Sequence, residues 1–334
     1  MKLTRTLLST TLVAAIGFSS FGALAADVLL KASHQWPGGK GDIRDEMVQI
    51  IARDVGAANV GLKIQVYPGK SLFKPKEQWG AIVKGKLDIT AFPLAYAGGR
   101  HPEFNLTLMP GLVKNHEHAQ RLNKSEFMKR IKKIMSDSGV MVLADTWPAG
   151  GFVSKKECIL GPETVKGQTF RAAGKAFNEM LAGAGASITS MPSSEIYSGL
   201  QTGVLDGANT SSASLVSYRI YEQVSCLTAP GENALWFMYE PILMSKKSFD
   251  SLNKAQQQAI LKASEKAEQF AYVGAKKADD TLRETYKKHG VKVVTMTAEQ
   301  AAQWQAIADK TSYKNFADKV KGGRELLDLA LSVK

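Results

Sequence analysis

Arg171 is the residue of this sequence best suited to bind a negatively charged group. It follows Phe170 in a short apolar run that we expect to form a β-strand. Open α/β sheets bind ligands beyond the carboxyl ends of their strands. A guanidinium matches a carboxylate in two parallel hydrogen bonds, and a bond to a charged group contributes about 1.5–3 kcal/mol. Arg171 is therefore a candidate carboxylate anchor, and an exposed or structurally paired arginine is the alternative.

Neutral polar residues follow Arg171 along the chain. Ser193 and Ser194 lie where a helix is expected to begin, and capping of that helix would explain at least one of them. The Asp206–Gly207 pair is typical of a turn. Asn209 and Thr210 come directly after it and offer uncharged hydrogen-bond donors and acceptors.

Aromatic residues lie at several predicted strand ends and loops. The candidates for a binding site are His34, Trp36, Phe92, Trp147 and Trp236. Each could equally serve core or hinge packing, because large aromatic side chains stabilise a fold by the area they bury. Gathered at one cleft, they would suit a flat or hydrophobic acid.

Catalytic motifs are weak in this sequence. It contains no Gly-x-Ser-x-Gly elbow, no phosphate-binding glycine loop and no His-Glu-x-x-His zinc motif. The segments 71–74 and 251–254 match Ser-x-x-Lys but have no convincing companion motif. A secreted serine hydrolase that uses Ser71 and Lys74 is thus the rival hypothesis from another functional class.

Neither a metal nor a cofactor is expected. The segment His116-Glu117-His118 places two imidazoles two residues apart, and such residues point to different sides of a helix. A solvated helix start after Pro110–Gly111 is the better interpretation.

The first 25 residues are predicted to be a signal peptide. Lys2 and Arg5 form a basic start, an apolar run spans 7–18, and Ala23-Leu24-Ala25 fits a cleavage site. No cysteine follows that site to carry a lipid, and no later apolar run approaches the ~18–20 residues that span a bilayer. We expect an exported protein, in the periplasm, that does not itself span the membrane.

Length and charge narrow the remaining classes. The chain has 334 residues, of which 44% are apolar and 22% charged, and this length predicts about two domains. Its net charge is +12, or +10 without Lys2 and Arg5, so its surface attracts anions. The lysines are scattered, with no arginine-rich arm and no aromatic-basic strip, so a nucleic-acid partner is not expected.

The two cysteines leave two interpretations open. In an oxidising compartment Cys158 and Cys226 could form a disulfide, which would close a long loop. The alternative is two separately buried thiols.

Strands and helices alternate along the chain. Strands are expected over 28–32, 63–67 and 87–92, with helices from 42 and over 79–84, which predicts a parallel α/β sheet. A second α/β unit follows the Gly/Pro-punctuated stretch 145–151, where we place a domain crossing. The chain returns through a strand-like run over 235–244.

A single long helix is expected late in the chain. Residues 254–288 contain no proline, Asn253 with Gln256 forms a capping box, and Gly290 supplies a stop. Such a helix would be roughly 52 Å long and could bridge two domains.

Three motifs together resemble the solute receptors of tripartite ATP-independent periplasmic (TRAP) transporters. They are the Lys-Gly turn and arginine-ended strand over 166–171, Ser-Glu-x-Tyr at 194–197 and Leu-Gln-x-Gly-x-x-Asp-Gly at 200–207. The resemblance covers essentially the whole mature chain. It implies a two-domain α/β periplasmic binding protein with a hinge and a long domain-spanning helix. Domain I would comprise 26–149 plus 236–275, and domain II 150–235 plus 276–334.

The resemblance also implies a function. A small organic acid would bind in the interdomain cleft with Arg171 on its carboxylate, and TRAP membrane subunits would receive it. Family members commonly place an asparagine three residues after Asp-Gly; here Thr210 stands there, with Asn209 one place earlier. Many also carry a second arginine about twenty residues before the anchor, where this chain has 149–152, Ala-Gly-Gly-Phe. Its absence favours a monocarboxylate, aromatic or hydrophobic, over a C4-dicarboxylate or sugar acid.

Overall fold

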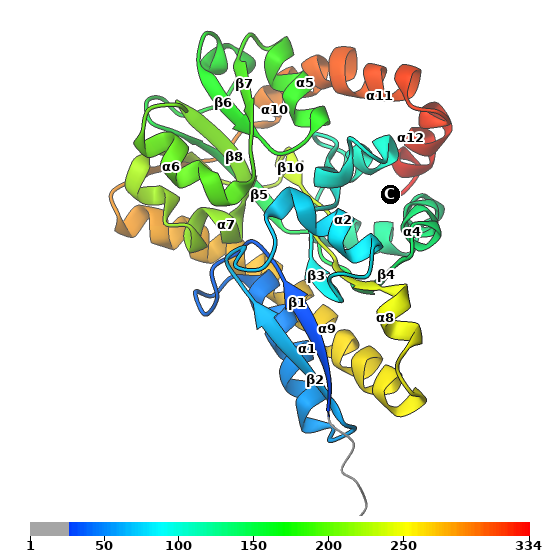
Figure 1. Ribbon diagram of the computed structural model, residues 1–334. Helices are drawn as coiled ribbons and strands as arrows, with labels where there is room; N and C mark the ends of the chain where they lie inside the picture. The colour runs from blue at the N-terminus through cyan, green and yellow to red at the C-terminus, as the bar shows by residue number, and fades with distance from the viewer. Residues whose placement is uncertain (1–26) are drawn as a thin grey trace, which may run out of the picture.

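The computed structural model describes residues 27–334, so the predicted signal peptide lies outside the described residues. The chain forms two β-sheets flanked by helices (Figure 1). The first sheet has the order β2-β1-β3-β11-β4. Its strands are β1 (Val28–Ser33), β2 (Leu62–Tyr67), β3 (Ile89–Ala91), β4 (Val140–Ala144) and β11 (Ile242–Ser245).

The second sheet has the order β12-β9-β5-β8-β6-β7, with β10 paired to β5. Its strands are β5 (Ala149–Ser154), β6 (Thr169–Ala172), β7 (Ser187–Ser190), β8 (Gly207–Ser211), β9 (Cys226–Thr228), β10 (Trp236–Phe237) and β12 (Lys292–Val294).

The prediction of a parallel sheet is wrong for part of each sheet. Strand β11 runs antiparallel to β3 and β4, and β5 runs antiparallel to β8, β9 and β10. The physical reason is the way the chain changes sheets. It passes from β4 directly into β5 and returns from β10 into β11 as extended chain, without the helical crossover that parallel neighbours need.

Helices cover both sheets. They are α1 (Ile43–Ala57), α2 (Gln78–Val83), α3 (His116–Asn123), α4 (Glu126–Asp137), α5 (Lys175–Gly183), α6 (Ile196–Gln201), α7 (Ser212–Ser217), α8 (Lys246–Asp250), α9 (Lys254–Lys288), α10 (Ala298–Ala308), α11 (Lys314–Lys319) and α12 (Gly323–Leu331). Met47 and Ile51 of α1 and Ile260 of α9 are buried in one core with β1 and β11.

The long helix has the predicted bounds. The Asn253 side chain accepts from the Gln256 backbone N–H at 2.9 Å, and the Gln256 side chain accepts from the Asn253 N–H at 3.1 Å. The chain turns away at Gly290, whose φ of 75° favours glycine. Helix α9 packs on α1 near its start, and Leu282 and Tyr286 near its end join the core of the second sheet (Figure 1). It therefore spans the two units of the molecule, which are the first sheet with its helices and the second sheet with its helices.

The proposed domain boundaries stay a prediction, and two elements lie across them. Strand β10 pairs with β5, so residues 236–237 belong to the second sheet by hydrogen bonding. Helix α12 packs beside α4 (Figure 1), where Arg130 and Glu325 form an ion pair at 2.6 Å. The carboxyl end of the chain thus contacts the unit of the first sheet.

Of the two interpretations of the cysteines, the structure has the disulfide. Cys158 and Cys226 are bonded, with their Cα atoms 5.2 Å apart, and the bond joins the segment after β5 to strand β9. Among residues 27–334, no helix combines the length and apolar character needed to cross a membrane.

Candidate ligand-binding site between the two sheets

Arg171 lies wholly buried in β6, with 0% of its surface exposed. Its Nε donates to the carbonyl of Met191 at 2.9 Å and its Nη1 to the carbonyl of Asn209 at 2.6 Å. Its Nη2 donates to the hydroxyl of Tyr96 at 3.0 Å. Tyr96 comes from the turn Leu94–Ala97 after β3, so the guanidinium meets both sheets.

The charge of Arg171 has no direct acidic partner. Within residues 27–334 this guanidinium forms no ion pair with an aspartate or glutamate; its three acceptors are uncharged. Burial lowers the pKa of Arg171, opposed by Tyr96 and by the more distant Glu240. A guanidinium has five N–H groups, so one on each terminal nitrogen has no acceptor among residues 27–334. The arrangement offers a charged two-pronged donor, the geometry that a carboxylate fits.

Hydroxyl groups surround the contact between the two units. The Tyr96 oxygen also accepts from the backbone N–H of Ser193 at 3.0 Å. Tyr218 follows α7 and donates to the carbonyl of Gln35 at 2.9 Å. Burial raises the pKa of Tyr218 well above its ordinary value, so this phenol stays protonated and can donate. Ser193 thus lies beside Tyr96, a partner of Arg171, and its contact with a ligand stays a prediction.

Strand β8 presents Asn209 and Thr210 to opposite faces. Ala208 is in register with Arg171, and side chains alternate along a strand, so Thr210 shares the Arg171 face. Asn209 contributes its backbone carbonyl to Arg171. Its side-chain amide points to the other face, where neither atom has a partner among the described residues although both are buried.

Trp236 packs against Gly150, in the stretch 149–152 where many family members have a second arginine. A Cβ at Gly150 would lie 2.5 Å from Cδ1 of Trp236 and 2.1 Å from the carbonyl oxygen of Thr210. Any larger residue at 150 would therefore displace the indole. The ring of Trp236 packs on Phe177 at 4.9 Å, and its Nε1 is buried with no partner among residues 27–334.

A second buried arginine, Arg44, was not predicted from the sequence. Its side chain is 0% exposed and lies over the ring of Trp36, 4.2 Å from the centroid. It pairs with Asp42 at 2.6 Å and with Glu240 at 2.5 Å. Its donors also reach Ser211 at 2.6 Å and Ser214 at 3.0 Å, from β8 and α7. Asp42 and Trp36, shortly before Arg44 in the sequence, were the signals that could have indicated its burial. An arginine in the first turn of a helix is ordinarily solvated, however.

Glu240 is an acid whose charge acts on both arginines: it pairs directly with Arg44 and lies farther from Arg171. It lies in the return from β10 to β11 and is 4% exposed. Burial raises the pKa of its carboxyl above the ordinary value, while the neighbouring Arg44 opposes that shift and Arg171 does so more weakly. Arg44 is neutralised by Asp42 and Glu240, whereas Arg171 has only this distant acid.

The loop after β1 supplies His34, Gln35 and Trp36. Trp36 donates from Nε1 to the hydroxyl of Ser214 at 3.1 Å, so it bridges the two units. Nε2 of His34 lies 3.2 Å from the Asp45 carboxylate, and its ring centroid is 6.0 Å from that of Trp36. Both polar atoms of the Gln35 side chain are buried without a partner in the described part of the chain.

The remaining two aromatic candidates differ. Phe92 is buried and meets Tyr96 edge to face, with centroids 6.2 Å apart, so it supports the anchor's partner. Trp147 donates to Asn123 at 2.7 Å and packs on Tyr239 at 4.9 Å. Its contacts are those of a core residue, and the structure does not bring it together with Arg171.

The residues of the metal and hydrolase motifs do not come together in one site. His116 meets Asp279 at 2.8 Å, whereas His118 contacts the carbonyl of Val333 at 2.9 Å. Residues 27–334 contain no group of three or more histidine, cysteine, aspartate or glutamate side chains arranged to hold a metal. The hydroxyl of Ser251 donates to the carbonyl of Ser248, and Ser71 is exposed in a turn.

Comparison with known proteins decides the family. The model of the bacterial extracellular solute-binding protein family 7, DctP, matches residues 56–319. The chain belongs to this family. A solute-binding protein of Albidiferax ferrireducens is 39% identical over 312 residues, which cover 92% of each chain. A C4-dicarboxylate-binding periplasmic protein of Rhodobacter capsulatus is 26% identical over 297 residues and 86% of each chain.

Solved structures agree with the family. A TRAP periplasmic solute-binding protein from Rhodoferax ferrireducens with bound malonate has a TM-score of 0.87 and 38% identity, covering 91% of this chain and 98% of that one. A Bordetella pertussis receptor that binds pyroglutamic acid has a TM-score of 0.82 at 23% identity, covering 91% and 99%. The predictions of a DctP-like TRAP receptor and of its two-domain α/β fold are confirmed.

Proposed function

We propose that this family member is a periplasmic receptor for a small organic acid, held by Arg171 in the space between the two sheets. One observation carries the proposal: a fully buried guanidinium without an acidic partner of its own, held by groups from both units. An unpaired buried charge is costly, and a carboxylate would neutralise it. The acid would then be delivered to TRAP membrane subunits.

The surroundings of Arg171 supply uncharged partners for the rest of the ligand. Thr210 shares its strand face, and Ser193 lies beside Tyr96. Gln35, whose carbonyl accepts from Tyr218, carries buried polar side-chain atoms that have no partner in the described chain. From the first unit, the proposed site would include Phe92, which packs on Tyr96, and Trp36 with His34, which lie where that unit meets Ser214.

A monocarboxylate fits this arrangement best. Trp236 takes the room beside Gly150, and the other buried cation, Arg44, already has Asp42 and Glu240. A second carboxylate would find no free positive charge among these residues. The ring of Tyr96 beside Arg171 would instead favour a flat or hydrophobic acid.

A dicarboxylate or sugar acid is the second candidate. It is favoured by the malonate in the related Rhodoferax structure and by the C4-dicarboxylate relative of Rhodobacter. Such a ligand would need Glu240 to release Arg44 or to take up a proton.

Ligand binding would be coupled to closure of the two units. Tyr96 meets Arg171 across the gap, and Arg44 meets Ser211. These contacts form only when the units are close, so a ligand that neutralises Arg171 stabilises the closed state.

A melting-temperature screen of residues 26–334 tests the proposal. The probes are pyroglutamate, aliphatic 2-oxo and 2-hydroxy acids, aromatic acids, malonate, succinate and glucuronate. A binding acid should raise the melting temperature of the parent protein, and Arg171→Ala should abolish that rise. Unchanged stabilisation in Arg171→Ala would overturn the anchor. A strong response to a dicarboxylate with none to monocarboxylates would replace the first ligand class by the second.

The matched control is Arg324→Ala, which removes an arginine whose side chain is exposed and which lies on α12. It should retain the response. Incubation of each stabilising acid with the protein, followed by chromatography, tests the hydrolase alternative, since a receptor returns its ligand unchanged.

A further inference from the structure

A cluster of positive side chains lies outside the Arg171 site, on the segment between β2 and α3. Its members are Lys70, Lys74, Lys76, Lys84, Lys86 and Arg100, and we name them the outer basic face. None of the six forms an ion pair with an acid among residues 27–334, although surface lysines such as Lys63 and Lys266 do. Their charges are therefore available to a mobile anion.

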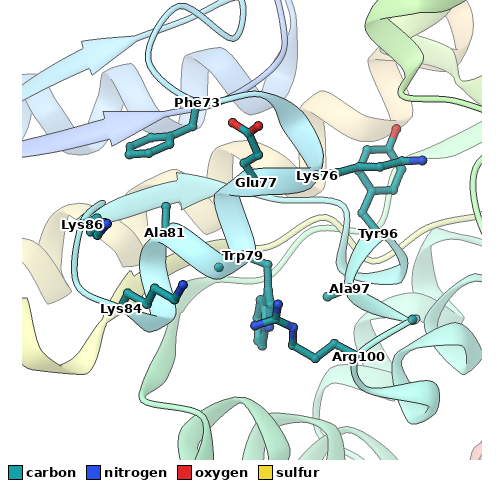
Figure 2. A pocket seen from close by; sticks show the side chains of 12 residues that line it. Phe73, Lys76, Glu77, Trp79, Ala81, Lys84, Lys86, Tyr96, Ala97 and Arg100 are labelled. Atoms are coloured by element: carbon teal, nitrogen blue, oxygen red, sulfur yellow. The ribbon is translucent and has the colours of Figure 1, made fainter.

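Two hollows open within the outer basic face. The first has a volume of ≈ 490 Å³ and is lined by Lys76, Trp79, Lys84 and Arg100, among others. Figure 2 shows Lys84 and Lys86 at one end, Arg100 near Trp79, and Lys76 with Tyr96 at the other end. Trp79 is 3% exposed, and its Nε1 has no partner among the described residues. Of the residues that the structure describes, Glu77 is the one acid that lines this hollow.

The second hollow lies between the two units. Its volume is ≈ 550 Å³, and its lining includes Lys70, Lys74 and Lys76 from one side and residues 190–192 and Glu195 from the other. Lys76 Nζ reaches across to the carbonyl of Ser190 at 3.4 Å. Lys76 and Glu77 line both hollows, so the two adjoin at these residues.

Each hollow ends on a residue that touches Arg171. Tyr96 lines the first, and its hydroxyl accepts from Nη2 of Arg171. Met191 lines the second, and its carbonyl accepts from Nε of Arg171. One residue therefore separates the buried guanidinium from solvent-open, positively charged space on both sides.

We propose that the outer basic face is a weak binding site for small carboxylate anions, from which they reach Arg171. Concave surfaces lined by one sign of charge raise the local concentration of counter-ions. Four cations against one carboxylate leave the first hollow positive, and Trp79 adds an apolar wall. The site itself stands apart from the proposed function; only the passage to Arg171 rests on it.

The test uses malonate as the probe in the Arg171→Ala background, which removes the inner anchor. Backbone amide NMR shifts are followed as sodium malonate replaces sodium chloride at constant ionic strength. Saturable shifts are expected at residues 73–100, with a dissociation constant in the millimolar range. Lys84→Gln/Lys86→Gln/Arg100→Gln should weaken that binding at least fivefold.

The matched control is Lys262→Gln/Lys287→Gln/Lys288→Gln. These three lysines lie exposed along α9 and also lack an acidic partner among residues 27–334, but they line neither hollow. The control should leave the shifts unchanged. Shifts that rise linearly without saturation, or that both triple variants reduce equally, would overturn the proposal. Neither result would change the conclusion about ligand binding at Arg171, because Arg171 is absent from the tested variants. The proposal for the outer basic face can therefore fail while the proposed function stands.

Discussion

The Arg171 guanidinium and the Tyr96 hydroxyl lie 3.0 Å apart, although Arg171 belongs to the second sheet and Tyr96 to the turn that follows β3 of the first. The Tyr96 oxygen accepts twice, from Arg171 and from the N–H of Ser193. A phenol oxygen that accepts two bonds still carries its own proton. That proton and the two free N–H groups of Arg171 therefore belong to one cluster of donors.

Tyr96→Phe is expected to weaken binding of a carboxylate without unfolding the protein. The change removes one hydroxyl, and a hydrogen bond to a charged group contributes about 1.5–3 kcal/mol, so affinity should fall by about 10- to 150-fold. Phe92 packs on the ring and not on the hydroxyl, so the apolar contact stays. Isothermal titration with the acid returned by the melting screen measures the loss.

Tyr197→Phe is the control for Tyr96→Phe. The Tyr197 hydroxyl donates to Glu222 at 2.9 Å on the exposed side of the second unit. This variant should bind like the parent protein. Equal affinity in all three proteins would exclude Tyr96 from the donor cluster.

Local signals predicted much of the fold. Asn253 and Gln256 are three residues apart, and their reciprocal capping bonds are a property of that short segment alone, so the start of α9 could be predicted. The direction of β5 and β11 could not. Both strands pair with segments far away in the chain, and alternation of strands with helices does not encode a passage between sheets.

The site was predictable only where a motif marked it. Arg171 stands in a motif, and the structure buries its side chain between groups of both units; its role as the carboxylate anchor stays a prediction. Arg44 carries no such mark, because its burial depends on Ser211 and Ser214, about 170 residues later in the sequence. Trp147 and Trp236 looked alike at the two predicted crossings. Asn123 satisfies the indole N–H of Trp147, whereas that of Trp236 has no protein partner in the described chain, and the sequence around them does not encode this difference.

Removal of the disulfide should destabilise the fold but leave ligand binding intact. Cys158 and Cys226 close a loop of 68 residues, and the chain-entropy model gives about 4 kcal/mol for a loop of that size. Urea unfolding of Cys158→Ala/Cys226→Ala measures this loss against the parent protein. An unchanged free energy of unfolding would mean that the bond adds no constraint, and a lost ligand response would place it in the site.

Arg44→Met should be strongly destabilising, because it leaves Asp42 and Glu240 buried without their cation. Breaking a buried ion pair from one side costs about 3–5 kcal/mol. Adding Asp42→Asn and Glu240→Gln removes both uncompensated charges, and asparagine keeps the cap that Asp42 gives to α1. The triple variant should recover most of the loss in urea unfolding. A triple variant as unstable as Arg44→Met would show that Arg44 acts through packing on Trp36 and not through charge.

Glu240 should make the stability of the protein fall as the pH rises above its unfolded-state pKa. Burial raises the pKa of this carboxyl in the folded protein above the ordinary value of 4.5, although the charge of Arg44 opposes the shift. The folded state therefore holds the proton more tightly than the unfolded chain. This contribution is complete below pH 4.5 and is lost as the pH rises through the folded-state pKa.

Glu240→Gln removes that dependence, and the difference between its stability and that of the parent isolates it from other titrating groups. Urea unfolding of both proteins at intervals from pH 4 upward should give a gap that changes steadily with pH and then levels off. Its total change, at about 1.4 kcal/mol per pKa unit, measures the shift. Glu232→Gln, a change of an exposed acid, supplies the control and should follow the parent curve. A Glu240→Gln curve parallel to the parent at every pH would mean that Glu240 titrates alike in the folded and unfolded states, so that burial and Arg44 cancel.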